Sequence, residues 1–359
     1  MDTSGSMDFQ GKLDQVRDSI FLVFGLLGED DYLSIVSFDN EIDVIMDAKR
    51  WGDVDREMAE RLLEELEARG GTDLYSGVEE ARDTLKGLGG EDEEVTKRIL
   101  LLSDGRDTER DVSEFNELAR SVAEEGISIY SAGIGTYYDK EVIRLLGEDT
   151  QGQWTHVNRP TDIRSFFGDV VQAASSVVAN SPQLVIDPAP GTEIAEVYRR
   201  SPQVQEVTPE YEDGDIIIGL PDLQEDQQQT VVLKMDAPGR DVGSEHALAT
   251  VGLEAGSRSA STEVSVEYTD DPDKLAQQDE NVFLAHRDTA IRSSIAQADS
   301  EDDLEDVESL IDETEVITGE TQIIDTLRDD VTRIESGDEE QVREVQEQTT
   351  VVYEGNQFE

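Results

Sequence analysis

Along the first half of the chain, the spacing of apolar residues switches repeatedly between a helical period and a strand period. Two runs, at 99–102 and 127–132, are short and uniformly apolar, so we expect them to be central strands covered on both faces. Strands that alternate with amphipathic helices predict a doubly wound, mostly parallel α/β sheet. The other expected strands are 32–38, 42–47 and 154–157, and the expected helices are 12–27, 54–68, 74–88, 112–124, 140–146 and 163–178.

Near Ser181 and Pro182 the pattern changes, because proline and glycine now separate short β-type runs. These runs predict an antiparallel β-sandwich. Beyond Asp270, apolar stripes at helical spacing predict acidic amphipathic helices that pack as a hairpin or bundle. We therefore predict an α/β domain at 1–180, a β-sandwich at 181–270 and an α-helical region at 271–359. The β-type runs are 184–186, 216–220, 230–235, 247–253 and 262–268.

Acidic residues are spread over every segment of the chain. There are 85 Asp and Glu against 29 Lys and Arg, which gives a formal net charge of -56. Acids on all surfaces keep a protein hydrated where salt screening is strong, so we expect a salt-adapted protein from the acidic proteome of a halophilic microbe. An acidic surface made for a basic partner is the alternative. Nucleic acid is disfavoured under either interpretation, because no basic stripe is present to displace counterions from phosphates.

The sequence gives little information on the redox compartment or on the targeting of the protein. The chain has no cysteine, which excludes disulfides and thiolate metal sites. No run of about 18 apolar residues predicts a membrane span. Met1 leads directly into Asp2 without the regions of a signal peptide. We expect a cytoplasmic protein.

Oxygen-bearing side chains stand at three expected corners between a strand and a helix. Asp2, Ser4 and Ser6 precede the first helix, Thr72 precedes the third, and Asp104 follows the buried strand 99–102. In an open parallel sheet such corners gather at the carboxyl edge of the strands, where ligands bind. We therefore expect these five side chains to meet although they are far apart in the sequence.

Two carboxylates and three hydroxyls form a set of hard oxygen donors suited to Mg²⁺, with Mn²⁺ and Ca²⁺ as alternatives. Gly5 lets the first loop bend, so that Ser4 and Ser6 point to one place. Because the hydroxyls are neutral, only Asp2 and Asp104 compensate the positive charge of the cation, and they do so in part. An open coordination position would then favour an incoming carboxylate.

These residues resemble the metal-ion-dependent adhesion site (MIDAS) of the Rossmann-like von Willebrand factor type A (VWA) domain, which has the pattern Asp-x-Ser-x-Ser, then Thr, then Asp. The match is complete at Asp2, Ser4, Ser6, Thr72 and Asp104. The resemblance implies a non-enzymatic module that grips a protein partner through the partner's Asp or Glu. It also implies that the two serines bind the metal directly and that Asp2 acts largely through water. Thr72 and Asp104 would exchange between direct and water-mediated contact with the metal. Soluble microbial members often work beside ring-shaped ATPases.

The chain departs from the family pattern at its start. The family places its central strand immediately before the first aspartate, whereas only Met1 precedes Asp2 here. Loss of that strand would expose unpaired edges in the middle of the sheet, so we expect the VWA domain to be N-terminally truncated. A missing upstream region would leave the targeting of the protein open. The alternative is a genuine start, with another segment in the gap.

Other interpretations of the same residues remain. Ser4, Ser6 and Asp2, like Asp73, are residue types that cap helices, and Asp107 is interpreted as a solvated loop residue. A metal-dependent phosphohydrolase would want a second acid where Ser4 stands, and no phosphate-binding glycine loop is present. A third possibility is a scaffold or oligomerisation protein with an incidental metal site. We interpret the three histidines, His156, His246 and His286, as structural or exposed.

Overall fold

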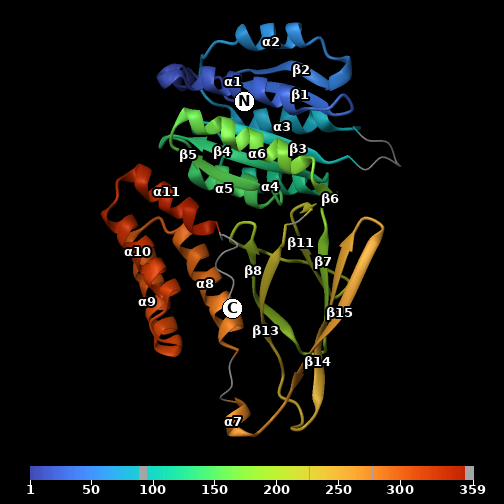
Figure 1. Ribbon diagram of the computed structural model, residues 1–359, viewed down its shortest axis with the longest axis vertical. Coiled ribbons are helices and arrows are strands. Elements are labelled where there is room, and N and C mark those ends of the chain that lie inside the picture. The colour runs from blue at the N-terminus through green and yellow to red at the C-terminus, as the bar shows by residue number, and fades with distance from the viewer. Residues whose placement is uncertain (89–94, 108, 226, 276–278, 352–359) are drawn as a thin grey trace. The chain divides into compact units, whose positions relative to one another are not determined.

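The computed structural model describes residues 1–359 except 89–94, 108, 226, 276–278 and 352–359. Contacts divide the chain into two compact units, Met1–Asn180 and Ser181–Glu359. In Figure 1 the colour follows the chain from blue at the N-terminus to red toward the C-terminus. Each unit has apolar cores of its own.

The first unit alternates helices and strands. Parallel strands β3, β4 and β5 pair in that order, while β1 and β2 form an antiparallel hairpin. The doubly wound α/β fold predicted from the sequence is confirmed. The strands are β1 (Tyr32–Phe38), β2 (Ile42–Arg50), β3 (Lys97–Ser103), β4 (Ile127–Ile134), β5 (Gln153–Val157) and β6 (Val177–Ala179). The helices are α1 (Lys12–Leu26), α2 (Arg56–Glu64), α3 (Leu74–Leu85), α4 (Val112–Glu124), α5 (Lys140–Glu148) and α6 (Ile163–Ala174), with 3₁₀ turns η1 (Gly5–Gly11), η2 (Trp51–Asp53) and η3 (Pro160–Asp162).

The first residues of the chain lie between β1 and β3. Asp2 forms a parallel bridge with Phe38 at the end of β1, and its backbone N–H donates to the carbonyl of Leu102 in β3 at 3.1 Å. The N–H of Thr3 donates to the carbonyl of Phe38 at 2.9 Å. The loop that follows Asp2 therefore starts at the same sheet edge at which β3 ends.

Two apolar cores lie in the first unit, one on each face of its strands. One packs α1, α2 and α6 against the strands, and the other packs α3, α4 and α5 against them. Side chains of β4 alternate between the cores, with Ala132 and Ile134 in the first and Ile127 and Ile129 in the second. All eight residues of β4 are buried, as expected for a strand covered on both faces.

The second unit begins with two antiparallel sheets. Strands β10, β11, β7, β14 and β15 form one sheet, and β13, β8 and β9 form the other. Apolar side chains of both sheets, such as Ile186 and Val197, share one core, so the sheets pack as a sandwich. Their bounds are β7 (Gln183–Pro188), β8 (Glu193–Ser201), β9 (Gln205–Glu206), β10 (Glu210–Glu212), β11 (Asp215–Gly219), β12 (Leu223–Gln224), β13 (Thr230–Asp236), β14 (Glu245–Ala255) and β15 (Arg258–Glu267).

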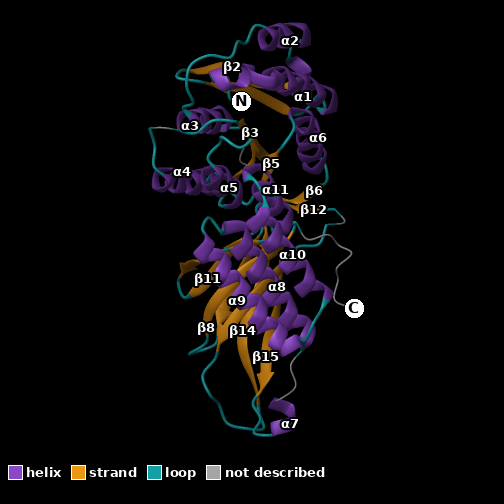
Figure 2. Ribbon diagram, turned by 90° about the vertical axis from the view of Figure 1, so that its left-hand side faces the viewer, coloured by secondary structure: helices purple, strands orange, loops and turns teal. Residues whose placement is uncertain are grey.

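Helices complete the second unit. Figure 2 shows α8 to α11 lying along one side of its strands, and α8 contacts β8, β9 and β13. The predicted apolar stripe is buried in the shared core of these helices at Ile324, Leu327, Val331 and Ile334. Within the described residues, no helix has the length and apolar character needed to span a bilayer. The helices are α7 (Pro272–Leu275), α8 (Glu280–Gln297), α9 (Glu301–Thr318), α10 (Gln322–Ser336) and α11 (Glu339–Thr350).

Several local predictions were wrong or missed an element. The helix predicted at 54–68 begins only at Arg56, because Asp55 caps its first turn by accepting from the N–H of Met58, and it ends at Glu64. The helix predicted at 163–178 ends at Ala174, and a short strand follows it. Strand β8 was missed, because the charged pair Arg199 and Arg200 interrupts its apolar pattern, yet both arginines are buried.

Candidate metal centre

The structure brings three loops of the first unit together at one edge of the sheet. The N–H of Gly5 donates to the carbonyl of Gly70 at 3.2 Å, which joins the loop after Asp2 to the loop before α3. The loop after β3 is equally close, because a Cβ on Gly105 would stand 2.3 Å from Oγ1 of Thr72. A side chain at position 105 would force Thr72 to move, so Thr72 lies directly against the Asp104 loop.

Hydroxyl and carboxylate oxygens meet where these loops touch. Oγ of Ser4 lies 3.0 Å from Oγ of Ser6, and the Ser6 hydroxyl donates to Oδ1 of Asp104 at 2.6 Å. Ser4 and Asp104 are buried, whereas Ser6 is exposed and Thr72 is half-buried. The cluster therefore has a buried side made by Ser4 and Asp104 and a side that solvent or another molecule can reach.

Asp2 lies beneath the serine hydroxyls and is fully buried. Its Oδ1 accepts the N–H of Ser4 at 2.7 Å, and its Oδ2 accepts the hydroxyl of Ser103 at 2.6 Å. Burial raises the pKa of this carboxyl, while the hydrogen bonds from Ser103 and Ser4 oppose that rise. Asp2 thus fixes the shape of the serine loop from below.

Helix capping does not account for the serine loop. The residue at the N-cap of α1 is Gly11, and Ser4, which precedes η1, makes no capping hydrogen bond through its side chain. Asp73 does have the capping role predicted for it, because its carboxylate accepts the N–H of Ser76 at 3.0 Å. The Ser4 hydroxyl faces Ser6 instead of a helix terminus.

Sequence reasoning missed two residues of this cluster. Lys12, in the first turn of α1, forms an ion pair with Oδ2 of Asp104, and its side chain is 13% exposed. Ser103 binds Asp2 as described above and also accepts the N–H of Gly105 at 3.2 Å. The only sequence signal for Ser103 is a hydroxyl at the end of an apolar strand. For Lys12 there is none, because a lysine at the start of an amphipathic helix is ordinarily solvated.

Asp107 lies in a loop as predicted, but its carboxylate is not simply solvated. This residue is half-buried, and its Oδ2 accepts the N–H of Tyr75 in α3 at 3.1 Å. Its Oδ1 accepts the N–H of Glu109 at 2.9 Å. Asp107 therefore ties the loop after β3 to the first turn of α3, which holds Asp104 and Thr72 side by side.

The chemistry of these donors fits a hard divalent cation. Within the described residues, no group of three or more His, Cys, Asp or Glu side chains could hold a metal ion. The cluster instead offers hydroxyl oxygens beside the carboxylate of Asp104, and hydroxyl and carboxylate oxygens together suit Mg²⁺, Mn²⁺ or Ca²⁺. Because the side chains of Ser4 and Asp104 already contact Ser6, little side-chain freedom would be lost on binding.

Comparisons with known proteins agree with the fold. Residues 1–171 match the model of the von Willebrand factor type A domain family. A structure described as von Willebrand factor type A from Catenulispora acidiphila superposes with a TM-score of 0.82 at 15% identity, covering 98% of this chain and 88% of that one. The ArnB paralog VWA2 from Sulfolobus acidocaldarius superposes with a TM-score of 0.60 at 16% identity, covering 97% and 86%.

Sequence comparison also gives a relative in Synechocystis sp., which is described only as an uncharacterized protein. It is 24% identical over 239 residues, which are 66% of this chain and 55% of the relative. The present chain thus spans little more than half the length of that relative. At these identities the likeness concerns the fold.

Proposed function

Because residues 1–171 form a von Willebrand factor type A domain, we propose that this chain is a Mg²⁺-dependent protein-binding module. VWA domains often mediate interactions between proteins and commonly bind a divalent metal at the MIDAS. The observation that carries the proposal is the direct contact of Ser4, Ser6 and Asp104 at the edge of the sheet.

The residues of the proposed site have distinct roles. Ser4 and Ser6 would bind the metal directly, and Thr72 and Asp104 would bind it directly or through water. Asp2 would act largely through water, since its two oxygens already accept hydrogen bonds from Ser4 and Ser103. When bound, the metal supplies an electrophilic centre of positive charge.

A partner carboxylate is the proposed ligand of this centre. Neutral hydroxyls on the exposed side would leave the cation short of negative charge, because the carboxylates lie on the buried side. An Asp or Glu side chain of another protein would supply the missing charge together with a hard oxygen ligand. A ring-shaped ATPase is one class of partner that the family suggests.

We also propose that the site binds without catalysing a reaction. A phosphohydrolase of this arrangement would need an acid or base near the metal besides the ligands themselves. The Lys12 ammonium beside the cluster is instead paired with Asp104. Phosphatase turnover that depends on metal and is abolished by Asp2→Ala would contradict this part of the proposal.

The dispersed acidic charge is proposed to be an adaptation to high salt. A net charge of -56 destabilises a compact chain by self-repulsion at low ionic strength, and salt screens that repulsion. The midpoint of urea unfolding should therefore rise between 0.1 and 2 M KCl. A midpoint that stays constant or falls would refute salt adaptation.

The test of the proposed function combines metal binding with capture of a partner. Calorimetric titration with Mg²⁺ and Mn²⁺ should show one site, which Ser4→Ala and Thr72→Ala weaken at least tenfold. The matched controls are Ser309→Ala and Thr84→Ala, whose hydroxyls only bond to the carbonyls of their own helices. The controls should bind metal as the natural protein does.

Capture of a partner from a native extract should then depend on bound metal. We expect a protein that is retained in Mg²⁺, is released by chelator and is absent from captures with Ser4→Ala. Restoring it with Mn²⁺ after chelation would support coordination by a partner carboxylate. Capture that survives both chelation and Ser4→Ala would show that the chain works as a scaffold with an incidental metal site.

A further inference from the structure

Two aromatic side chains are exposed in loops next to the metal cluster. Phe9 is 67% exposed and Tyr137 is 75% exposed, which makes them the most exposed large apolar side chains among the described residues of the first unit. Single exposed apolar residues are common on protein surfaces. Here both lie at the same edge of the sheet, because Phe9 follows the serine loop and Tyr137 follows the parallel strand β4. Exposed apolar groups that gather beside a candidate site indicate an interaction surface.

The loop that carries Phe9 is anchored by Met7, whose side chain is fully buried in the core. Phe9 itself has extended backbone angles, and Gln10 and Gly11 follow it with positive φ angles of 58° and 69°. Two successive residues in the left-handed region turn the chain before α1 begins. The loop therefore buries one apolar side chain and holds the other in solvent, shortly after Ser6.

The loop that carries Tyr137 is built in a similar way. Its neighbour Tyr138 is fully buried, and the Tyr138 hydroxyl lies 3.0 Å from Nδ1 of His156. Arg106, in the loop after β3, donates from Nε to the carbonyl of Tyr137 at 3.2 Å. The guanidinium of Arg106 also lies over the ring of Tyr137, 5.7 Å from its centroid. Tyr137 is thus held by its neighbours although its ring is exposed.

A short path of contacts connects Tyr137 with the metal cluster. Arg106 contacts Tyr137 and stands two positions after Asp104, which accepts the hydroxyl of Ser6. The strands behind these loops are neighbours, since the first residues of the chain lie between β1 and β3, and β3 pairs with β4. The loops that carry Phe9 and Tyr137 therefore span about 10 Å of the sheet edge, a width that an extended peptide of a few residues covers.

Arg106 adds a positive charge to this surface. Its side chain is exposed, and the two contacts described above are with a carbonyl and a ring, so neither of them neutralises the guanidinium. A guanidinium beside a bound divalent cation favours an acidic partner segment and disfavours a basic one, although the chain as a whole has a net charge of -56. Arginine and aromatic residues are also the types that contribute most to binding at protein interfaces.

We propose that Phe9, Tyr137 and Arg106 determine which carboxylate the metal site accepts. The preferred ligand is an Asp or Glu of a partner protein that has large apolar residues on both sides of it. Its carboxylate binds at the metal cluster, while its apolar neighbours contact the rings of Phe9 and Tyr137. Arg106 attracts the acidic segment and supports the ring of Tyr137. This inference rests on the proposed metal-dependent function and specifies the partner of the same site.

Fluorescence anisotropy with dye-labelled peptides and the full-length chain in Mg²⁺ tests the inference. Each of two short capped peptides carries one central aspartate, which is flanked by phenylalanine in the first and by serine in the second. We expect the phenylalanine-flanked peptide to bind at least tenfold more tightly. Chelator, or asparagine in place of its aspartate, should remove most of that binding. Equal affinity of the two peptides, or equal binding of the asparagine peptide, would overturn the inference.

Variants separate the aromatic contacts from the metal site. Phe9→Ala and Tyr137→Ala should each weaken binding of the phenylalanine-flanked peptide about tenfold. Both should leave the serine-flanked peptide and the calorimetric uptake of Mg²⁺ unchanged, because neither ring belongs to the cluster of oxygen ligands. Arg106→Gln should weaken both peptides, since it removes a charge that attracts the acidic segment.

Two matched controls lie away from this surface. Tyr211→Ala removes a ring that is 68% exposed on β10 of the second unit. Arg61→Gln removes a guanidinium whose contacts lie within its own helix α2. Both controls should bind both peptides as the natural protein does. A loss of binding in the controls equal to that in Phe9→Ala and Arg106→Gln would refute the assignment of this surface.

Calorimetry distinguishes failure of this inference from failure of the proposed function. Normal uptake of Mg²⁺, together with peptide affinities that Phe9→Ala and Tyr137→Ala leave unchanged, would refute the role of the two rings alone. Absence of binding of either peptide to the Mg²⁺-loaded chain would refute it as well. A chain that takes up no Mg²⁺ would contradict the proposed function itself, and the inference would fall with it.

Discussion

Lys12 and Asp104 form an ion pair at the centre of the metal cluster, although they are 92 positions apart in the sequence. The ammonium lies against Oδ2 of the carboxylate, while Oδ1 accepts the Ser6 hydroxyl at 2.6 Å. Both oxygens of Asp104 are therefore engaged by groups of this chain. A cation that binds Asp104 has to compete with the Lys12 charge, which opposes a second positive charge nearby.

Replacing Lys12 by methionine should strengthen metal binding. The change removes the competing charge and keeps the aliphatic stem, so we expect the affinity for Mn²⁺ to rise about tenfold, which corresponds to about 1.4 kcal/mol. Calorimetric titration measures it, with Lys86→Met as the control, because Lys86 pairs with Asp83 at the far end of α3. A lower affinity in Lys12→Met would mean that the lysine supports the site.

Gly105→Ala should remove metal binding while leaving the fold in place. The added Cβ would stand 2.3 Å from Oγ1 and 3.1 Å from Cβ of Thr72, so Thr72 has to move away from the Asp104 loop. We expect at least a tenfold loss of affinity and a cost of about 1 to 3 kcal/mol in the free energy of unfolding.

The control for this glycine is Gly25→Ala inside α1, where an added Cβ meets nothing within 4 Å. That change should stabilise the chain by about 0.5 to 1 kcal/mol and leave metal affinity untouched. Full metal affinity in Gly105→Ala would show that Thr72 is not part of the site.

Metal should stabilise the first unit and not the second. At a Mg²⁺ concentration of 100 times Kd, the free energy of unfolding should rise by about 2.7 kcal/mol, because the cation binds the folded state. Trp51 and Trp154 are the two tryptophans of the chain, and both belong to the first unit, so their fluorescence reports its unfolding. Ser4→Ala should remove most of the increase, and an equal increase in that variant would point to binding elsewhere.

His286 should couple the stability of the second unit to pH. Burial lowers the pKa of this histidine below 6.5, while Glu196, with Oε2 at 3.1 Å from Nε2, partly opposes the effect. Because the unfolded chain binds the proton more readily, stability is fully present above pH 6.5 and is lost as the pH falls through the pKa of the folded state.

The charge of Glu196 provides the test. Glu196→Gln should lower the pKa of His286 further, since it removes the favourable carboxylate. The titration can be followed by NMR on the three histidines, with His286→Gln for assignment and Glu263→Gln as a control on exposed β15. A rise in the pKa of His286 in Glu196→Gln would contradict the pairing.

Many helices and strands of the first unit could be predicted from local sequence. The buried strand β4 and helix α4 were predicted because a uniform apolar run and a helical period are properties of a few consecutive residues. The gathering of Ser4, Ser6 and Asp104 was predictable for a different reason. Parallel strands place their carboxyl ends at one edge, so the order of elements already implies which loops lie near one another.

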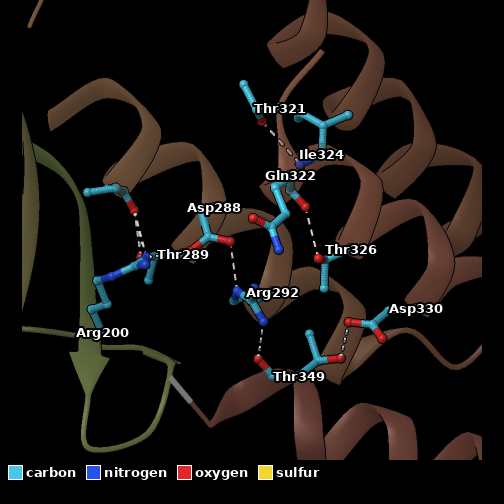
Figure 3. A network of polar contacts seen from close by, with 11 residues as sticks. Arg200, Asp288, Thr289, Arg292, Thr321, Gln322, Ile324, Thr326, Asp330 and Thr349 are labelled. Atoms are coloured by element: carbon cyan, nitrogen blue, oxygen red, sulfur yellow. Dashed lines mark hydrogen bonds and ion pairs between the residues drawn. The ribbon is translucent and has the colours of Figure 1, made fainter. Parts of the chain in front are cut away.

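Tertiary structure alone decided the contacts of charged side chains. Lys12 contacts Asp104, and Arg200 of β8 contacts Asp288 of α8 (Figure 3), because distant elements pack together. The spacing of apolar residues along the sequence does not predict this packing. Strand β8 was missed for the same reason, because its arginines look solvated until the helices bury them. The sequence by itself therefore determines the helices and strands, through the spacing of apolar residues, and the order in which they follow one another. The partner of a buried charge depends instead on which distant surfaces pack together.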